Sequence, residues 1–549
     1  MTAWVPRTSE RTFTPNLPSP ANTAWVVHAA AVCVGAIAAV NGWDLPFALA
    51  AIVAIVAGRA RQFLAIASVL LFTVSFPPFS WPAWWICLAP LMWIWRDRAT
   101  KLNKFQLAAE AVVIGFSIGW LSTGFVRAVL PSWGWLIHAV ACLLFSLRVV
   151  AIAIAVRLTR NRPVVVSAFA CSLAAVFAEL FEAWCGGVLW AATNLALAVA
   201  DKPLAQWAHW ISPFGVSGLL YLANFLFVLD HASSGCRRWL GVLLAAAVLA
   251  TAWAGGSWIQ TAARTPLSFS VLLVQPHIRG GGVGQPWRPW LVLDRQTRRA
   301  LADTGGVDLV VWPEASLSAS WHVEPGAQVV DHSTRLTIAD FANTLVPQYQ
   351  TNCLVGAVML ERGTVDRYGL EVSEVRRYNC AYLVSRSGAI AHHKKLQLVP
   401  LLEGLPRPLD HVAIRRRVLP LIGLKAPLSP GREYRPLAFR DRAGNRHSIA
   451  VAVCYESFFP WLPQYHDQEV DAIVHLVYDG DTAAHPSVIE RHVRACQYRA
   501  IETRKWNLVC STWTGSAIID PSGKIVAQLP TKAGVLASGV VPGSENAGY

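Results

Sequence analysis

The stretch Val451-Ala-Val-Cys454-Tyr455-Glu456 is a short apolar run that ends in a cysteine and a polar pair. Two upstream stretches belong with it: Val310-Val-Trp-Pro-Glu314 and His393-Lys-Lys395-Leu-Gln-Leu-Val-Pro400. Short β-branched runs are typical of buried strands. Glu314, Lys395 and Cys454 are therefore each expected at the exit of a β-like run.

These three residue types together form one kind of nucleophilic site. A cysteine attacks a carbonyl as a thiolate, so it needs a base that takes its proton, and a carboxylate such as Glu314 can do so. A lysine such as Lys395 lowers the thiol pKa and stabilises the oxyanion of a tetrahedral intermediate. The three motifs therefore predict a catalytic cysteine, Cys454, with an acid–ammonium pair beside it.

The motifs lie in a half of the chain where short apolar runs alternate with helix-like stretches. This alternation predicts an α/β domain, layered as an α-β-β-α sandwich, over residues 266–540. The expected strands are 269–275, 307–312, 352–358, 379–384, 447–453, 471–477, 506–510 and 516–520, and the expected helices include 290–304 and 488–504.

The first half of the chain has the composition of a membrane domain. The 549 residues are 54% hydrophobic and 15% charged, and most of the apolar excess precedes residue 260. A spanning helix needs about 20 apolar residues. We expect a loose cytoplasmic tail over 1–23 and a helical membrane domain over 24–260. Its apolar segments are 24–41, 45–58, 63–78, 83–95, 105–122, 134–156, 164–181, 211–230 and 239–257, of which the second and fourth are short.

Basic residues mark one side of this membrane domain. They cluster in alternate loops, and the loops between hold almost nothing basic beyond Arg127 and Lys202. Basic loops face the cytoplasm, so the sandwich should lie on the outer side. The net charge of +14 is then explained by lipid headgroups and orientation, because no basic face of the kind that binds nucleic acid is evident.

Four ionisable residues fall inside apolar segments: Glu110, Arg148, Glu179 and Glu182. Such residues are costly in contact with lipid, so we expect them to face the interior of the bundle or a polar cavity. Glu179 and Glu182 lie three residues apart, on one face of a helix. Structural pairing and substrate contact both fit this pattern.

The motifs around Glu314, Lys395 and Cys454 resemble those of the nitrilase, or carbon–nitrogen hydrolase, superfamily. Joined to a helical membrane domain, they resemble specifically the apolipoprotein N-acyltransferase family of the bacterial inner membrane. The likeness runs from about residue 63 to 535. In the membrane half it is carried by Phe76-Pro-Pro-Phe-Ser-Trp-Pro82, Ala178-Glu-Leu-Phe-Glu-Ala-Trp184 and Pro213-Phe-Gly-Val-Ser-Gly-Leu-Leu220.

The resemblance implies a role for each site residue. Glu314 would be the general base, Lys395 the oxyanion stabiliser and Cys454 the nucleophile. Lys395 is preferred to Lys394 because it lies eight residues before Glu403, as in the family. The supporting or substrate-binding residues would be Glu403, Tyr455, Glu456 and a tryptophan after the first strand, either Trp287 or Trp290.

The resemblance also implies a reaction and a location. The cysteine would take the sn-1 acyl chain of a phospholipid as a thioester. It would then pass the acyl group to the α-amine of the diacylglyceryl-cysteine of an apolipoprotein. The partners would be the bilayer, the phospholipid and the apolipoprotein, and no metal or other cofactor is needed. The protein would be a multi-pass inner-membrane protein with a periplasmic catalytic domain.

The sequence departs from the family mainly in the loops that face substrate. The segment 477–483 reads Val-Tyr-Asp-Gly-Asp-Thr-Ala, where the family has bulky apolar flap residues. The family's Phe-Gly before the second glutamate is here Leu401-Leu402, and the chain stops without the family's last membrane helix. These differences affect the acceptor or the acyl donor more than the chemistry.

Other function classes remain open at this point. A diverged paralogue could acylate another amine or act as a membrane-anchored amidase, and an inactive binding subunit is a third class. The intact triad argues against the last. Five histidines could suggest a metal site, but their spacing fits no zinc pattern, so we interpret them as core or surface residues. They are His392, His393, His475, His485 and His492.

Overall fold

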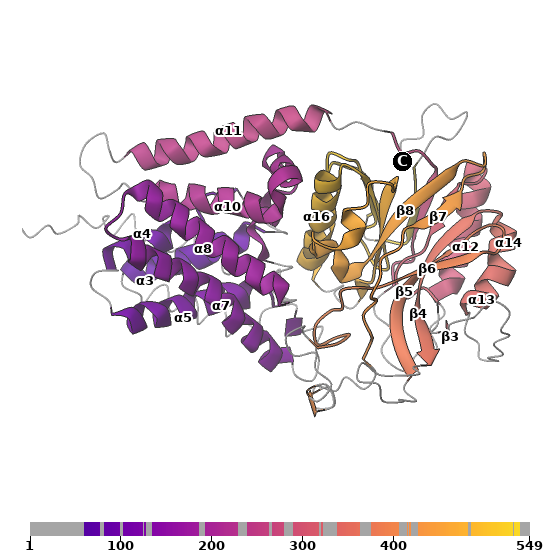
Figure 1. Cartoon of the computed structure of the whole chain (residues 1–549), viewed down its shortest axis with the longest axis horizontal. Coiled ribbons are helices and arrows are strands. Elements are labelled where there is room, and N and C mark those ends of the chain that lie inside the picture. Colours follow the sequence, from indigo (N-terminus) through magenta and orange to yellow (C-terminus); the bar gives the residue numbers. More distant parts are fainter. Residues whose placement is uncertain are drawn as a thin grey trace, which may run out of the picture.

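The computed structural model describes most of residues 60–538. The segments left undescribed are 77–81, 99–102, 125, 128–133, 186–192, 229–238, 263–265, 279–288, 318–319, 322–336, 363–374, most of 406–426, 481–484 and 531. The predicted tail over 1–23, and the predicted apolar segments 24–41 and 45–58, lie outside the described residues. Figure 1 shows two parts, a helical bundle and a sandwich of two sheets, joined side by side.

The bundle contains the apolar helices expected from the sequence. Five helices in the described part of the chain are long and apolar enough to cross a membrane. The predicted segments 63–78 and 83–95 form shorter helices, of 15 and 10 residues. The described helices are α3 (Ala60–Val74), α4 (Ala89–Arg98), α5 (Lys104–Ser122), α7 (Gly134–Thr159), α8 (Val164–Trp184), α10 (Ala208–Val228) and α11 (Leu240–Ala262), with the short turns η1 (Leu195–Val199) and η2 (Pro203–Trp207).

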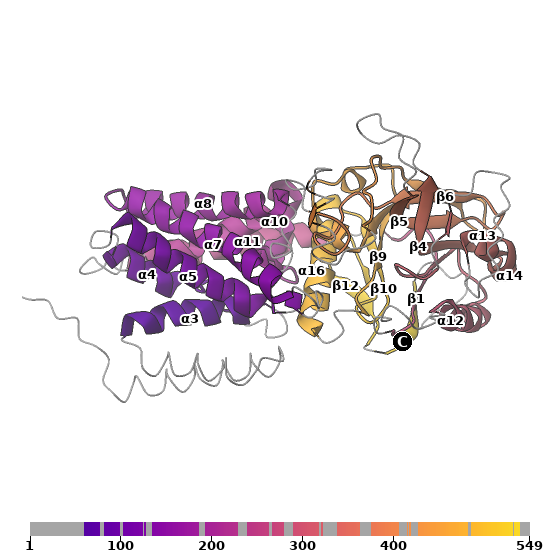
Figure 2. The same ribbon diagram turned by 90° about the horizontal axis from the view of Figure 1, so that it is seen from below.

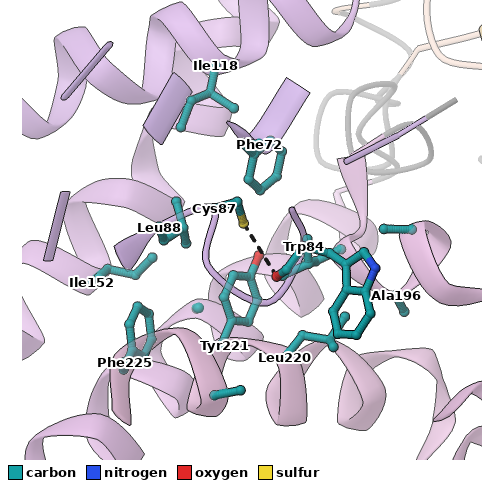
Figure 3. Close-up of a cluster of buried hydrophobic side chains, with 14 of the residues drawn as sticks. Phe72, Trp84, Cys87, Leu88, Ile118, Ile152, Ala196, Leu220, Tyr221 and Phe225 are labelled. Carbon is teal, nitrogen blue, oxygen red and sulfur yellow. Dashed lines mark hydrogen bonds between the residues drawn. The ribbon is translucent and has the colours of Figure 1, made fainter. Parts of the chain in front are cut away.

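The centre of the bundle is a close-packed apolar cluster (Figure 3). Phe72, Cys87 and Tyr221 are fully buried there, and they come from α3, the turn before α4, and α10. The Cys87 thiol donates a hydrogen bond to the Trp84 carbonyl. The outward faces of α7 and α8 carry exposed leucines, valines and phenylalanines, as expected for helices in contact with lipid.

Three of the four ionisable residues lie together in the bundle interior. Arg148 is fully buried and forms ion pairs with Glu179 (3.1 Å) and Glu182 (2.6 Å). The Tyr221 hydroxyl donates a further hydrogen bond to Glu179. This arrangement confirms the expected inward orientation and favours structural pairing. Glu110 differs, because it is only half-buried near the start of α5.

The second half of the chain folds into two facing sheets. The first has the strand order β13-β1-β2-β4-β5-β6, with β3 paired to β4, and the second has the order β12-β11-β10-β9-β8-β7. The strands of the first sheet are β1 (Val271–Gln275), β2 (Leu309–Val311), β3 (Ser320–Trp321), β4 (Asn352–Arg362), β5 (Val375–Val384), β6 (Ile390–Lys394) and β13 (Gly534–Ser538). Those of the second are β7 (Leu437–Arg440), β8 (Arg446–Val453), β9 (Ala472–Val477), β10 (Trp506–Ser511), β11 (Ala517–Ile519) and β12 (Ile525–Gln528).

Alternate residues of each central strand enter different layers of the core. In β1, Val271 and Leu273 face the second sheet, whereas Leu272 and Val274 face the helices on the outer side, because side chains along a strand point to opposite faces. The outer helices of the first sheet include α12 (Pro289–Thr304), α13 (Ile338–Asp340) and α14 (Val346–Tyr349), and that of the second is α16 (Pro486–Thr503). The predicted α-β-β-α sandwich is confirmed.

The helix α16 joins the sandwich to the bundle (Figures 1 and 2). Its Ala495, Tyr498 and Ile501 belong to the same apolar cluster as the bundle helices. Its polar side chains reach backbone carbonyls of the bundle: Arg491 donates to Ser122, Arg494 to Leu197 and Ala198, and Tyr498 to Ala196. The position of the sandwich relative to the bundle is therefore fixed by direct hydrogen bonds.

Candidate active site

Glu314 follows β2 in a tight turn that passes over β4. The turn is possible because the residue beneath it is a glycine: a Cβ at Gly356 would lie 2.6 Å from the Glu314 Cα. Ala315 has a positive φ of 56°, which bends the chain back after the glutamate. The carboxylate of Glu314 is thereby held in the interior, with 5% of the residue exposed.

Lys395 follows β6 and is also buried. Its Nζ lies 2.9 Å from Glu403 Oε1 and 3.6 Å from Glu314 Oε1. Burial lowers the pKa of this ammonium, but Glu403, Glu314 and Cys454 together raise it above the usual lysine value. Lys395 is therefore a fixed positive charge between two carboxylates.

Asn379, on β5, completes this arrangement. Its amide Nδ2 donates to Glu314 Oε1 and to Glu403 Oε1, so it links the two carboxylates that hold Lys395. The second oxygen of Glu403 accepts a hydrogen bond from the Val399 amide. Sequence reasoning missed Asn379. Its signal is a single amide side chain inside the apolar strand Tyr378–Val384.

Cys454 lies at a sharp bend directly after β8. Its φ is +50°, an uncommon value for a side chain other than glycine, and the short 3₁₀ turn η6 (Cys454–Phe458) begins there. The thiol is partly buried and donates to the Tyr478 carbonyl over 3.9 Å. The bend thus presents the sulfur away from the strand that precedes it.

The electrostatics of Glu314 and Cys454 are those of a proton-transfer pair. Burial raises the pKa of the Cys454 thiol well above its usual value, the Glu314 carboxylate raises it further, and Lys395 opposes the rise. Burial also raises the pKa of Glu314, against the effect of Lys395. Both shifts favour a neutral thiol beside a carboxyl group of raised basicity, an arrangement that suits general-base activation of a nucleophile.

Glu456 connects the segments that carry Lys395 and Cys454. Its Oε1 accepts hydrogen bonds from the Leu396 and Gln397 amides, and its Oε2 accepts one from the Val453 amide. Burial would raise its pKa, but His393 and these amides lower it below the usual glutamate value. Glu456 is therefore an ionised link between the two strand ends.

The other predicted site residues lie in different surroundings. Tyr455 is buried in an apolar cluster that also contains Phe214 of α10 and Ala183 of α8, so the residue after the cysteine contacts the bundle. Trp290 packs against the core on the outer face of the first sheet, within α12, and contributes to the packing of that helix. Trp287 lies outside the described residues.

The segment 477–483 is described as far as Gly480. Asp479 is buried, and its carboxylate accepts hydrogen bonds from Thr512 Oγ1 and from the Trp513 amide. Burial raises its pKa and these hydrogen bonds oppose the rise. Asp479 thus joins the loop beside Cys454 to the loop after β10. The substituted positions Asp481 and Thr482 lie outside the described residues.

Two of the histidines form a buried network near Cys454. Ser457 Oγ lies 2.9 Å from His475 Nδ1 and 3.1 Å from His492 Nε2. Burial lowers the pKa of His475 to about 3 and that of His492 to about 4, so both are neutral. Among the described residues, no group of three or more His, Cys, Asp or Glu side chains could hold a metal ion.

Fold and site together define a class: a membrane-embedded helical bundle that carries an α-β-β-α sandwich with a Glu–Lys–Cys centre. The carbon–nitrogen hydrolase family matches residues 252–543, and the apolipoprotein N-acyltransferase N-terminal domain matches residues 67–226. The chain belongs to the carbon–nitrogen hydrolase family, and specifically to its apolipoprotein N-acyltransferase group.

Curated relatives match over most of the chain. The apolipoprotein N-acyltransferase of Rhodopseudomonas palustris is 26% identical over 517 residues, which cover 88% of this chain and 90% of the relative. That of Photobacterium profundum is 23% identical over 507 residues, 88% of this chain and 89% of the relative. Apolipoprotein N-acyltransferase 2 of Treponema denticola is 28% identical over a shorter 226 residues, 41% of this chain and 39% of the relative.

Proposed function

We propose that this protein moves a fatty acyl chain from a membrane phospholipid, through a thioester on Cys454, to the N-terminal amine of diacylglyceryl-cysteine in an apolipoprotein. The observation that carries the proposal is the location of the Glu–Lys–Cys centre. The turn η6 begins at Cys454, and the helix α16 contacts the Cys454 backbone through His492. Both elements pack on the apolar bundle. A site at this junction suits substrates that remain in the bilayer.

In the first half-reaction, Glu314 accepts the thiol proton as the Cys454 sulfur attacks the ester carbonyl of the phospholipid. The S–C bond forms and the carbonyl oxygen becomes an oxyanion, which the Lys395 ammonium stabilises. The C–O bond of the ester then breaks, and the lysophospholipid leaves with the proton from Glu314. The product is an acyl thioester on Cys454.

In the second half-reaction, the α-amine of the lipoprotein cysteine attacks the thioester carbonyl. Glu314 accepts a proton from the amine, the C–S bond breaks, and the thiolate takes the proton back. Holding the lipid and the cysteine in one geometry can supply about 7–11 kcal/mol of the barrier lowering. We place the bundle in the bacterial inner membrane and the sandwich on its periplasmic side, supported by the distribution of basic loops.

Growth rescue tests the acceptor part of this proposal. A strain depleted of its own apolipoprotein N-acyltransferase should grow when it expresses this chain, and its major lipoproteins should carry a third acyl group. The Cys454→Ala variant, expressed at the same level, should not restore growth. If the parent protein forms the thioester but does not rescue, the acceptor is another amine, as the altered segment 477–483 would suggest.

A further inference from the structure

Two basic residues stand out in the loops on the side of the bundle that meets the sandwich, Arg127 and Lys202. Lys202 forms an ion pair with Asp201 at 2.7 Å, and both side chains are about two-fifths exposed. Exposed ion pairs of this kind contribute little to stability. The pair with Asp201 accounts for Lys202 as an ordinary surface residue. Arg127 is different, because aromatic rings hold its guanidinium.

Arg127 lies on a platform of two tryptophans at the outer end of α5. Its Cζ is 4.3 Å from the centre of the Trp135 ring and 5.3 Å from that of Trp120. Trp120 in turn stacks on His138, at 4.5 Å between ring centres. The Arg127 Nε donates to the Gly124 carbonyl over 3.3 Å, and a guanidinium carries further N–H donors in a planar fork that matches the geometry of a phosphate.

Residues of the sandwich approach the same place. Burial lowers the pKa of His485, the residue before α16, and the positive charge of Arg127 adds to this effect. Arg491, on the same helix, donates to the Ser122 carbonyl and lies 4.8 Å above the Phe76 ring. Positive potential therefore gathers where α16 meets the end of α5.

This place is linked to the nucleophile by a short, rigid segment. His485 precedes α16, and His492 lies seven residues further along, about 10 Å at 1.5 Å per residue. His492 contacts the Phe458 ring at 5.0 Å between centres and hydrogen-bonds to the Cys454 backbone. In a glycerophospholipid only the glycerol backbone separates the phosphate from the ester carbonyls. A phosphate held where α16 meets the end of α5 thus places an ester on the side of that helix that leads to Cys454.

We propose that Arg127, on its Trp120–Trp135 platform, binds the phosphodiester of the phospholipid acyl donor. This inference rests on the proposed function and deepens it, because it names the group of the donor that the enzyme recognises. The phosphate is common to all glycerophospholipids. The site therefore selects a class of donor and orients its ester, while the variable headgroup alcohol lies beyond the contact.

Binding by the unreactive full-length Cys454→Ala protein tests the proposal without the need for catalysis. Calorimetric titration with dihexanoyl phosphatidylethanolamine in detergent should give an affinity that falls at least about tenfold on Arg127→Gln, the loss expected for a charge-assisted hydrogen bond. Arg127→Lys keeps the charge but not the planar fork and should lose affinity severalfold. Lys202→Gln, the matched control, should bind like the parent.

Two further ligands identify what is recognised. Dihexanoylglycerol lacks the phosphate and should bind all four proteins equally. Inorganic phosphate should compete only at concentrations far above that of the lipid. Equal affinity of the Arg127→Gln and parent proteins would overturn the proposal, and so would displacement of the lipid by equimolar phosphate, which would indicate a site for free phosphate.

The outcome is separable from that of the proposed function. Arg127-dependent binding without thioester formation by the wild type would leave the phosphodiester site standing and reject the acyltransferase. Thioester formation by the wild type, with equal lipid binding by the parent and Arg127→Gln proteins, would support the acyltransferase and reject the phosphodiester site. Both variants at Arg127 can be checked for folding by their thermal unfolding midpoint, and the lysine variant preserves the stacking stem if the glutamine variant does not fold.

Discussion

Replacing Lys395 with methionine should reduce the rate of Cys454 acylation by at least about 10²–10³-fold, the loss seen when one oxyanion-stabilising group is removed. The same change should lower stability markedly. Glu314 and Glu403 both lie within 4 Å of the Lys395 ammonium, and without it Glu314 would remain buried and Glu403 partly buried. Removing one partner of a buried ion pair costs about 3–5 kcal/mol.

Lys394→Met is the matched control for this experiment. Lys394 is the adjacent residue and pairs with Glu361, but both side chains are about one quarter exposed. Its loss should change the acylation rate little and the stability by about 1 kcal/mol or less. The comparison is made by measuring the acylation rates and the thermal unfolding midpoints of the Lys394→Met and Lys395→Met variants. A larger effect at Lys394 than at Lys395 would show that the wrong lysine has been assigned to the site.

Replacing Glu314 with glutamine should lower acylation by about 10²–10⁴-fold, the usual contribution of a general base. Glutamine keeps an oxygen that can accept from Asn379, and Lys395 keeps Glu403 at 2.9 Å. The folded pKa of Glu314 is raised, chiefly by burial, so its contribution to stability is present at low pH and is lost as pH rises through that pKa. Removing the charge should therefore leave the unfolding midpoint at pH 7 unchanged or higher.

The pH dependence of the acylation rate gives a second test of Glu314 as the base. As pH falls through the raised pKa of Glu314, the carboxylate binds a proton and can no longer accept one from Cys454. The wild-type rate should therefore decline on the acid side at a pH above 4.5, the ordinary glutamate value. The Glu314→Gln variant should lack this decline. The control Glu361→Gln should keep both the rate and the acid limb, and an acid limb retained by Glu314→Gln would exclude Glu314 as the base.

The sequence predicted the strands at the centres of the two sheets and missed those at their edges. The eight expected strands correspond to β1, β2, β4, β5, β8, β9, β10 and β11. The strands β6, β7, β12 and β13 stand at the ends of the two sheets. A central strand is covered on both faces and reads as a continuous apolar run. An edge strand such as β12, in which exposed and half-buried residues alternate, carries a weaker signal.

The site was predictable in part for a related reason. Glu314 and Cys454 follow the predicted strands β2 and β8, whereas Lys395 follows the missed edge strand β6 and was found from its motif, and the structure brings the three together. Asn379 was missed because a single amide inside a strand carries no motif. The role of α16 was missed because its arginines, such as Arg494, bond to backbone carbonyls far away in the sequence. Contacts of a side chain with a distant backbone carbonyl leave no pattern in the sequence from which they could be predicted.

The most direct test of the central claim is the intact mass of the protein after incubation with palmitoyl-containing phosphatidylethanolamine. The wild type should gain the mass of one palmitoyl group, release an equal amount of lysophospholipid, and lose the added mass on treatment with neutral hydroxylamine, which cleaves thioesters. Cys454→Ala should gain nothing. Cys185→Ala should behave like the wild type, since Cys185 is the other described cysteine that is not fully buried. An unmodified wild type, or an acyl group on the Cys454→Ala protein, would contradict the assignment of Cys454 as the acyl carrier.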